Sequence, residues 1–213
     1  EMKKKIAILG STGSIGKTLI EIIKKDKKNF EIVLLTADEN YKELLRQAKI
    51  FKVKNLIITN KKTHFLLKNK NNKNFKIYND FSSFKKIFKT KIDYVMNSIT
   101  GLDGLKPTLE VIKFTKNIAI ANKEAIICGW NLIDKELKKY KTNFIPVDSE
   151  HFSIWSLVKN KKFSDIKKVY ITASGGPFLK LPKKNFSQIT IKEALNHPTW
   201  KMGKKITIDS ATL

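Results

Sequence analysis

The chain has 213 residues, enough for one large domain or two small ones, and 41% of them are hydrophobic, so it can bury a substantial core. Its formal charge is +24, but arginine, on which base and phosphate recognition draws heavily, occurs only at Arg46, and the lysines are scattered along the whole chain. Composition therefore argues against a nucleic-acid-binding protein, although a positive field would help to attract an anionic substrate.

No stretch of about 18 apolar residues is present, and no charged segment followed by an apolar core marks a signal peptide. We therefore expect no membrane partner and a cytoplasmic location. The single cysteine, Cys128, excludes an internal disulfide and suits a reducing compartment. Cys128 ends the apolar run 125–128, which favours a buried thiol over a reactive one.

A glycine-rich turn follows the first apolar run. Residues 6–9 are apolar, glycines follow at positions 10, 13 and 16, and residues 18–23 show helical periodicity. Strand, glycine turn and helix together predict a phosphate-binding turn, because the glycines allow close backbone approach and the helix N-terminus attracts an anion. The spacing differs from the commoner G-x-G-x-x-G, so a merely tight turn remains the alternative. A second predicted strand at 31–35 favours a Rossmann-type dinucleotide site.

An acidic residue, Asp38, follows that second strand. In dinucleotide folds an acid about 20 residues beyond the glycine turn accepts from the ribose 2′-hydroxyl, which predicts NAD(H). Alternatively, Asp38 caps a predicted helix at residues 41–51. The sequence alone leaves both interpretations open.

Strands and helices continue to alternate. Further strands are predicted at 55–59, 76–78, 92–96 and 117–120, with a helix at 102–114 and a polar loop at 68–74. Such alternation predicts an α/β fold with a parallel sheet. Ligands bind beyond the carboxyl ends of such strands, which places residues 97–101 and 121–124 around the cofactor.

Two carboxylates, Asp148 and Glu150, follow the apolar run 144–147. If the strand continues through them, both point to one face, and a divalent cation such as Mg²⁺ or Mn²⁺ would relieve their repulsion. The alternative is a turn that opens a helix at 152–155, with Asp148 or Ser149 as its N-cap.

The last third of the chain offers two further anion-binding candidates. Residues 169–173 predict a strand that leads into a Ser-Gly-Gly-Pro turn at 174–177, which can offer backbone donors. His197 lies in an irregular stretch bounded by Pro198 and Gly203, and loops of this kind often close over substrates. A structural role for His197 is the alternative.

Six motifs in order resemble one family from end to end. They are the glycine turn 10–16, Ala-Asn-Lys-Glu at 121–124, Pro-Val-Asp-Ser-Glu-His at 146–151, Ala-Ser-Gly-Gly-Pro-Phe at 173–178, the segment 197–203 and Asp-Ser-Ala-Thr at 209–212. The sequence resembles 1-deoxy-D-xylulose-5-phosphate reductoisomerases. That family rearranges a linear deoxy-ketose phosphate and reduces the product with NADPH, giving 2-C-methyl-D-erythritol 4-phosphate in the non-mevalonate isoprenoid pathway.

The resemblance implies roles for individual residues. Cofactor contacts are implied for Thr12, Gly13, Ser14, Ile15, Ala37, Asp38, Glu39, Asn40, Asn122, Glu124 and Gly203. Substrate contacts are implied for Lys123, Ser149, Glu150, Ser174, His197 and Ser210, of which Lys123, Glu150 and His197 are also candidate catalytic residues. Asp148 and Glu150 are the implied ligands of Mn²⁺ or Mg²⁺, and Trp200 and Met202 match a closing flap.

Two departures from the family pattern bear on function. Asp38 and Glu39 stand where the family usually has glycine and a basic residue, so the preference for NADPH over NADH is open. The chain stops at Leu213, before the family's Asn-Lys-Gly-Leu-Glu segment, which supplies phosphate contacts and a third carboxylate ligand. We therefore expect a fragment that is inactive alone.

The resemblance predicts two domains, a Rossmann-like NADP(H)-binding domain at 1–147 and the first part of an α/β or α+β catalytic domain at 148–213. It implies a small phosphorylated sugar as substrate and a homodimer for the complete enzyme. Two alternatives remain: another Rossmann-type NAD(P)-dependent dehydrogenase that needs no metal, and a basic nucleic-acid-binding protein, which the single arginine disfavours.

Overall fold

The chain forms two compact units, Glu1–Ser156 and Leu157–Leu213. The computed structural model describes residues 2–69, 74–201 and 203–212, so the centre of the polar loop at 68–74 and Met202 of the expected flap lie outside the described residues. The predicted domain boundary after residue 147 stays a prediction.

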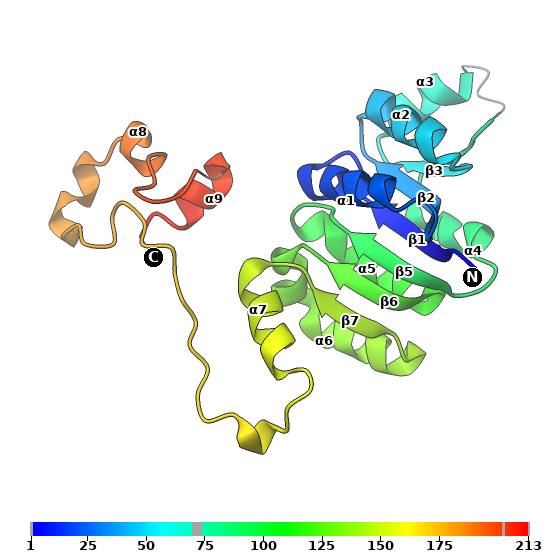
Figure 1. Ribbon diagram of the computed structural model, residues 1–213. Coiled ribbons are helices and arrows are strands. Elements are labelled where there is room, and N and C mark those ends of the chain that lie inside the picture. Colours follow the sequence, from blue (N-terminus) through cyan, green and yellow to red (C-terminus); the bar gives the residue numbers. More distant parts are fainter. Residues whose placement is uncertain (1, 70–73, 202, 213) are drawn as a thin grey trace. The chain divides into compact units, whose positions relative to one another are not determined.

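A seven-stranded parallel sheet forms the centre of the first unit, in the order β4-β3-β2-β1-β5-β6-β7 (Figure 1). Its strands are β1 (Lys4–Leu9), β2 (Phe30–Ala37), β3 (Asn55–Ile58), β4 (Lys76–Tyr78), β5 (Ile92–Asn97), β6 (Thr115–Ile120) and β7 (Asn143–Pro146). β1 pairs with β2 on one side and β5 on the other, so the strand order reverses direction there. This confirms the predicted α/β fold with a parallel sheet.

Helices cover both faces of the sheet (Figure 1). One apolar core lies under α1 (Ser14–Lys25), α2 (Tyr41–Phe51) and α3 (Lys61–Asn69). The other lies under α4 (Phe84–Ile87), α5 (Leu105–Val111) and α6 (Lys123–Tyr140). Strands covered on both sides need apolar residues at successive positions, and Ala7, Ile8 and Leu9 of β1 are all fully buried.

Short 3₁₀ turns flank α4 and α5. They are η1 (Phe81–Ser83), η2 (Leu102–Gly104) and η3 (Ile112–Phe114). The helix predicted at 102–114 is therefore one α-helix with a 3₁₀ turn at each end. Pro107 explains the late start of α5, because proline lacks an N–H and fits the first turn of an α-helix but not its interior.

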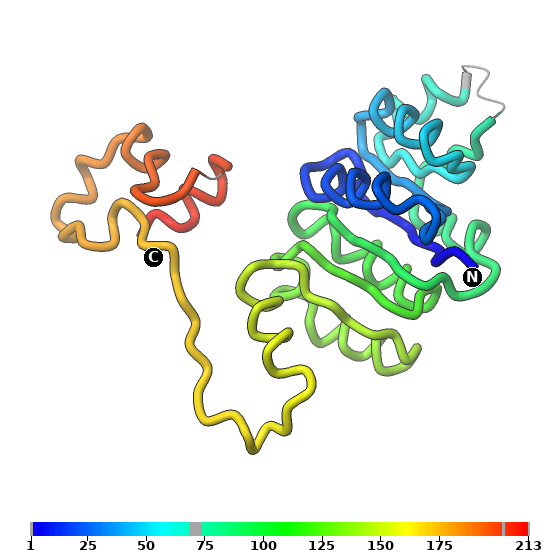
Figure 2. Tube along the Cα trace, viewed as in Figure 1, coloured from blue at the N-terminus to red at the C-terminus, as the bar shows by residue number. Residues whose placement is uncertain are grey.

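α7 (Ser149–Val158) follows β7 directly, and the second unit that comes after it contains short helical elements. They are η4 (Phe163–Asp165), η5 (Lys183–Gln188), α8 (Ile191–Ala194) and α9 (Lys204–Asp209). The strand predicted at 169–173 is wrong: the stretch is extended, as Figure 2 shows, but no strand of the described residues pairs with it. Tyr170 and Ile171 are each 77% exposed. A strand is defined by its hydrogen-bonded neighbour, and β-propensity alone supplies none.

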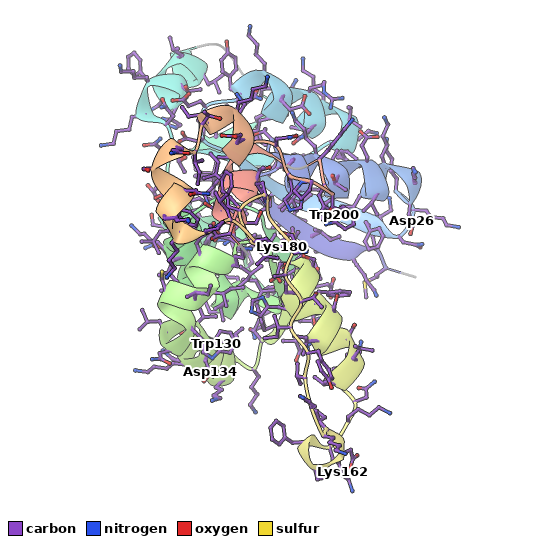
Figure 3. All side chains as sticks on the ribbon, turned by 90° about the vertical axis from the view of Figure 1, so that its left-hand side faces the viewer. Asp26, Trp130, Asp134, Lys162, Lys180 and Trp200 are labelled. Carbon is purple, nitrogen blue, oxygen red and sulfur yellow. The ribbon has the colours of Figure 1, made fainter. Side chains whose placement is uncertain are left out.

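Cys128 is exposed on α6, so the predicted buried thiol is wrong. An apolar run of four residues goes round a whole helical turn, and here Ala125 and Ile126 face the core whereas Ile127 is 69% exposed. Further along the same helix, Trp130 packs on Phe144 of β7 with ring centroids 5.4 Å apart. Figure 3 labels Trp130 and Asp134 on this helix.

Candidate functional site

A cavity of about 450 Å³ opens at the carboxyl ends of β1, β2, β3 and β5. It is lined by Gly10, Thr12, Gly13, Thr36, Ala37, Asp38, Thr59, Phe81, Ser98, Ile99, Thr100 and Asp103. The cavity lies where the strand order reverses between β1 and β5, the position at which open α/β sheets bind ligands. The expected location of a cofactor site is thus matched by a real cavity.

The glycine turn requires glycine at two positions. Gly10 has a φ of +75°, and a Cβ there would meet the backbone of Ser98 and Ile99 at 3.1 Å. A Cβ on Gly16 would lie 2.5 Å from the carbonyl oxygen of Gly10, so only glycine lets α1 pack this closely on the turn. Gly13 meets only an ordinary contact and serves instead as the N-cap of α1.

Hydrogen bonds from three elements hold the turn. Thr36 of β2 accepts from the Gly10 N–H at 2.9 Å, and Ser98 donates to the carbonyl of Leu9 at 2.8 Å. From α2, the side chain of Gln47 donates to the carbonyl of Ser11 at 3.0 Å. Because these partners lie in regular elements or directly after them, the turn is fixed before any ligand arrives.

The N-terminus of α1 is suited to an anion. Its N-cap, Gly13, has no side chain to cap the first N–H groups, and no acidic residue occurs in the first turn. The structure places Thr12, Gly13, Ser14 and Ile15 at this helix end, and Thr12 and Gly13 also line the cavity. Their role as pyrophosphate contacts stays a prediction. Helix ends of this kind bind phosphate through N–H groups and the helix dipole.

Asp38 lies on the wall of the cavity, but the prediction that it caps α2 is wrong. Asn40 is the N-cap and accepts from the Glu43 N–H at 3.2 Å. Asp38 instead accepts from the hydroxyl of Thr59 at 2.6 Å, and Glu39 accepts from the side chain of Asn60 at 3.0 Å. Both acids are exposed, and Asp38 brings an acidic side chain to this part of the cavity wall.

Asn122, which was expected to border the nicotinamide, is 4% exposed. Its side chain donates to the carbonyls of Ile99 (2.7 Å) and Gly101 and accepts from the Ala125 N–H at 3.0 Å, capping α6. A cofactor contact from Asn122 would therefore come from its main chain. The next two residues, Lys123 and Glu124, form the first turn of α6, and Lys123 is exposed.

Sequence reasoning missed several cavity residues. Thr36, Thr59, Phe81 and Asp103 were not singled out. Thr36 and Thr59 end or follow predicted strands, so the rule that ligands bind at the carboxyl ends of parallel strands could have found them. Phe81 and Asp103 lie in 3₁₀ turns, for which the sequence carries no comparable signal.

The two carboxylates of the Asp-Ser-Glu motif do not share the face of a strand, because β7 ends at Pro146 and α7 begins at Ser149. Asp148 caps α7 by accepting from the His151 N–H at 2.8 Å, which confirms the capping alternative. Both carboxylate oxygens of Asp148 also contact His151 Nδ1, at 2.8 and 2.9 Å. Glu150 accepts from the Ser149 hydroxyl at 2.8 Å.

Electrostatics favour a charged Asp148. Burial raises the pKa of this carboxyl, but hydrogen bonds from the N–H and ring of His151, with a smaller contribution from Glu150, bring the pKa below its ordinary value. An ionised carboxylate with Glu150 as its neighbour is a hard oxygen donor set. Within the described ranges, no group of three or more His, Cys, Asp or Glu side chains is arranged to hold a metal.

In the second unit, the Ser-Gly-Gly turn packs against the end of α9. A Cβ on Gly176 would collide with the carbonyl oxygens of Ser210 and Ala211, and the Phe178 N–H donates to the Ala211 carbonyl at 2.8 Å. This close packing brings the segments of Ser174 and Ser210, two expected substrate contacts, side by side. Gly203, an expected cofactor contact, is the N-cap of α9.

His197 has one nitrogen bonded and one free. Its Nδ1 accepts from the N–H groups of Thr199 (3.1 Å) and Trp200 (3.0 Å), so the proton of the neutral ring lies on Nε2. His197 Nε2 and Ser174 Oγ are both buried atoms without a hydrogen-bond partner among the described residues. Buried polar atoms are normally satisfied, so two donors without acceptors mark the second unit as a candidate ligand site.

Comparison with models of protein families shows to which family the chain belongs. Residues 6–129 match the profile described as 1-deoxy-D-xylulose 5-phosphate reductoisomerase, and residues 144–213 match the profile of the C-terminal domain of the same enzyme. The chain belongs to the 1-deoxy-D-xylulose 5-phosphate reductoisomerase family. The resemblance inferred from the six motifs is confirmed.

Relatives named 1-deoxy-D-xylulose 5-phosphate reductoisomerase include those of Pelagibacter ubique, 64% identical, and Clostridium kluyveri, 42% identical. Each match covers 99% of this chain but 55% and 56% of the relatives. The chain thus spans about half the length of the curated reductoisomerases it matches.

Solved reductoisomerase structures have the same fold. The enzyme from Zymomonas mobilis in complex with NADPH matches with a TM-score of 0.86 at 30% identity, over 99% of this chain and 54% of that one. A reductoisomerase in complex with NADPH, fosmidomycin and magnesium matches with a TM-score of 0.81 at 32% identity, over 98% and 54%. Where the chain is described, no helix has both the length and the apolar character needed to cross a membrane.

Proposed function

We propose that this chain forms the cofactor domain and the first part of the catalytic domain of a metal-dependent NADPH reductoisomerase. The reaction is the conversion of 1-deoxy-D-xylulose 5-phosphate to 2-C-methyl-D-erythritol 4-phosphate, a step of the non-mevalonate isoprenoid pathway. The observation that carries the proposal is the cavity at the reversal of strand order, with an uncapped helix N-terminus at its edge, in a chain that belongs to this family.

The residues present fit a dinucleotide. Gly10 and Gly16 let the turn pack closely against neighbouring backbone, and the N-terminus of α1 has no side-chain cap that would compete with a phosphate. Thr12 to Ile15 would hold the pyrophosphate and Ala37 to Asn40 the adenosine ribose. The main chain of Asn122, with Glu124 and Gly203, would border the nicotinamide, which supplies hydride when the cofactor is bound.

NADPH is the proposed cofactor even though Asp38 and Glu39 are acidic. A carboxylate accepts from a ribose 2′-hydroxyl and repels a 2′-phosphate. In this chain part of that repulsion is offset by the many lysines, which give the protein a formal charge of +24. A reduced preference for NADPH is the expected result.

The carboxylate pair fits a divalent cation. Asp148 and Glu150 would hold Mn²⁺ or Mg²⁺, which when bound lowers the pKa of a substrate hydroxyl and polarises the neighbouring carbonyl. His151 keeps Asp148 oriented and ionised. Two carboxylates leave most of an octahedral shell to water, so further ligands are needed to fix a metal for chemistry.

The proposed contacts of the phosphorylated substrate are polar side chains. The Nε2–H of His197 and the hydroxyl of Ser174 are buried donors without partners, as a phosphate or sugar oxygen requires. Ser210, Ser149, Glu150 and Lys123 complete the proposed set, with Trp200 in a loop that closes over the site and excludes water. The corresponding partition is 1–147 for the cofactor domain and 148–213 for the catalytic part, in a cytoplasmic homodimer.

A chimera tests the proposal. Residues 1–213 are continued by the C-terminal remainder of the Pelagibacter ubique relative, and NADPH oxidation is followed with 1-deoxy-D-xylulose 5-phosphate and Mn²⁺. We expect metal-dependent turnover by the chimera, weak metal binding and no useful turnover by residues 1–213 alone, and loss of most of the rate in the chimera with Asp148→Asn.

Three results would contradict the proposed function. Robust turnover by residues 1–213 alone would refute the claim that the metal needs ligands beyond Asp148 and Glu150. Full activity of the folded Asp148→Asn chimera would refute the metal site. Turnover that persists in a chelator would favour the alternative, a metal-independent dehydrogenase.

A further inference from the structure

Phe81 forms part of the wall of the 450 Å³ cavity. It lies at the β4 end of the strand order β4-β3-β2-β1, and the glycine turn lies at the β1 end. Phe81 begins η1, directly after β4, whereas the glycine turn follows β1. Between them lie Asp38 after β2 and Thr59 after β3, where the ribose next to adenine is expected. A dinucleotide whose pyrophosphate lies on α1 and whose ribose lies at Asp38 therefore has its purine near Phe81.

The ring of Phe81 has a rigid support. Its centroid lies 5.5 Å from that of Phe84, which is 1% exposed and packs in turn on Phe88 and Phe114 at 5.7 and 6.5 Å. Such an aromatic cluster fixes the position of the ring and gives it few alternatives.

The backbone that carries Phe81 is fixed as well. The side chain of Asn79 donates to the carbonyls of Ile58 (2.8 Å) and Thr59 (3.3 Å), which ties the entry to η1 to the end of β3. Phe81 and Thr59 are thus held on one wall of the cavity. A surface fixed in this way loses little entropy when a ligand packs on it.

We infer that Phe81 is the adenine-contacting residue of the cofactor site and supplies a flat apolar surface for the purine. This inference rests on the proposed dinucleotide function and adds to it the residue that binds the adenine half. Aromatic side chains stack on bases irrespective of base identity, because every base has a π-face. A phenylalanine without hydrogen-bonding groups therefore adds affinity for both NADPH and NADH, and the choice between them is left to Asp38 and Glu39.

Phe81 also lines a second cavity of about 270 Å³, together with Phe84, Phe114, Glu110, Lys85, Lys113 and Ser82. The residue therefore lies between two cavities. Removal of its ring would leave the purine without that wall, so a change at this position should affect the adenine half of the cofactor and spare the nicotinamide half.

The test compares the two halves of the cofactor. Dissociation constants for NADPH, for ADP as the adenine half and for reduced nicotinamide mononucleotide are measured by calorimetry on wild type, Phe81→Ala, Phe81→Leu and Phe81→Tyr. Phe65→Ala is the matched control, because Phe65 is 65% exposed on α3 and lines neither cavity. Circular dichroism and thermal melting confirm that each variant is folded.

We expect Phe81→Ala to weaken NADPH and ADP about tenfold or more and to leave the mononucleotide unchanged. Phe81→Tyr should keep near-wild-type affinity, Phe81→Leu should lie between, and Phe65→Ala should have no effect. Unchanged ADP affinity in folded Phe81→Ala, or equal losses for both halves, would overturn the role of Phe81 while leaving the dinucleotide site intact. A wild-type protein that bound neither NADPH nor ADP would overturn the dinucleotide function itself.

Discussion

The side chain of Gln47 on α2 donates a hydrogen bond of 3.0 Å to the backbone carbonyl of Ser11, and both residues are fully buried. α2 supplies none of the expected pyrophosphate contacts, but through Gln47 it helps to fix the turn that carries them. The same side chain donates to Glu43 at 3.0 Å, so Gln47 links the glycine turn to the polar face of α2.

Replacement of Gln47 should loosen the glycine turn. Gln47→Ala leaves the buried Ser11 carbonyl without its donor, and an unsatisfied buried group costs about 1–3 kcal/mol. We expect urea denaturation to show a loss of stability in that range and NADPH affinity to fall. Gln47→Leu restores most of the side-chain volume without the hydrogen bond, so a leucine variant as stable as wild type would show that packing, and not the hydrogen bond, is what matters.

Exchange of the two acids after β2 should strengthen the preference for NADPH. Wild type should bind NADPH more tightly than NADH by a modest factor, and Asp38→Gly/Glu39→Lys should widen that factor because it removes two negative charges and adds a positive one near the 2′-phosphate. Titration of both cofactors measures the ratio. If wild type binds NADH tenfold more tightly, a difference of about 1.4 kcal/mol, then Asp38 reads a 2′-hydroxyl and the cofactor is NADH.

Loss of the His197 ring should affect substrate and spare the cofactor. His197→Ala removes a donor whose tautomer is fixed by Thr199 and Trp200, and a hydrogen bond to a charged group contributes about 1.5–3 kcal/mol. We expect the chimera to bind a phosphonate inhibitor at least tenfold more weakly, with unchanged NADPH affinity. His64→Ala on α3 is the control, and an equal loss of inhibitor and cofactor binding would assign His197 to a structural role.

Stability should depend on the ionisation of Asp93 in β5. The Lys116 ammonium donates to this carboxylate at 2.9 Å and the Lys5 N–H donates at 2.9 Å, and together they hold the pKa of Asp93 below its ordinary value despite partial burial. The ionised form is thus favoured in the folded state. Its stabilisation is present above the ordinary pKa of about 3.9 and is lost as pH falls through the lowered folded-state pKa.

Urea denaturation at neutral pH and near pH 3 measures this contribution. Asp93→Asn should lose a few tenths to about 1 kcal/mol at neutral pH, because the pair is largely solvated, and the difference from wild type should shrink at low pH. Lys116→Met removes the ammonium, so in this background Asp93→Asn should cost less stability at neutral pH than it does in wild type. A gap between wild type and Asp93→Asn that widens on acidification would contradict the assignment.

The parts of the fold that the sequence predicted are those with strong local signals. β1, the glycine turn and α1 could be inferred because apolar residues, glycines and helical periodicity follow one another within 25 residues. The predicted strand at 169–173 failed because β-propensity does not provide a partner strand. The prediction of a buried Cys128 failed because a short apolar run does not show which side of a helix each residue faces.

The residues of the candidate site also divide into those that the sequence could predict and those that it could not. Residues on the glycine turn and at strand ends were predictable, because topology places the carboxyl ends of parallel strands together. Phe81 and Gln47 were not, because the position of Phe81 in the cavity wall and the contact of Gln47 with the glycine turn depend on how η1 and α2 pack on the sheet. For the Asp-Ser-Glu motif the interpretation as a continued strand was wrong and the helix-capping alternative was right, because α7 begins at Ser149.

The central place of β1 has a consequence for synthesis of the chain on the ribosome. β1 pairs with β2, which follows it closely, and with β5, whose last residue is Asn97. A nascent chain that has emerged only through β4 carries four of the seven strands, with one edge of β1 unpaired and the cavity wall at Ser98 to Thr100 not yet made. The cavity is therefore complete only after β5 has emerged, and a pause before β5 would leave an unpaired apolar strand edge exposed to other chains.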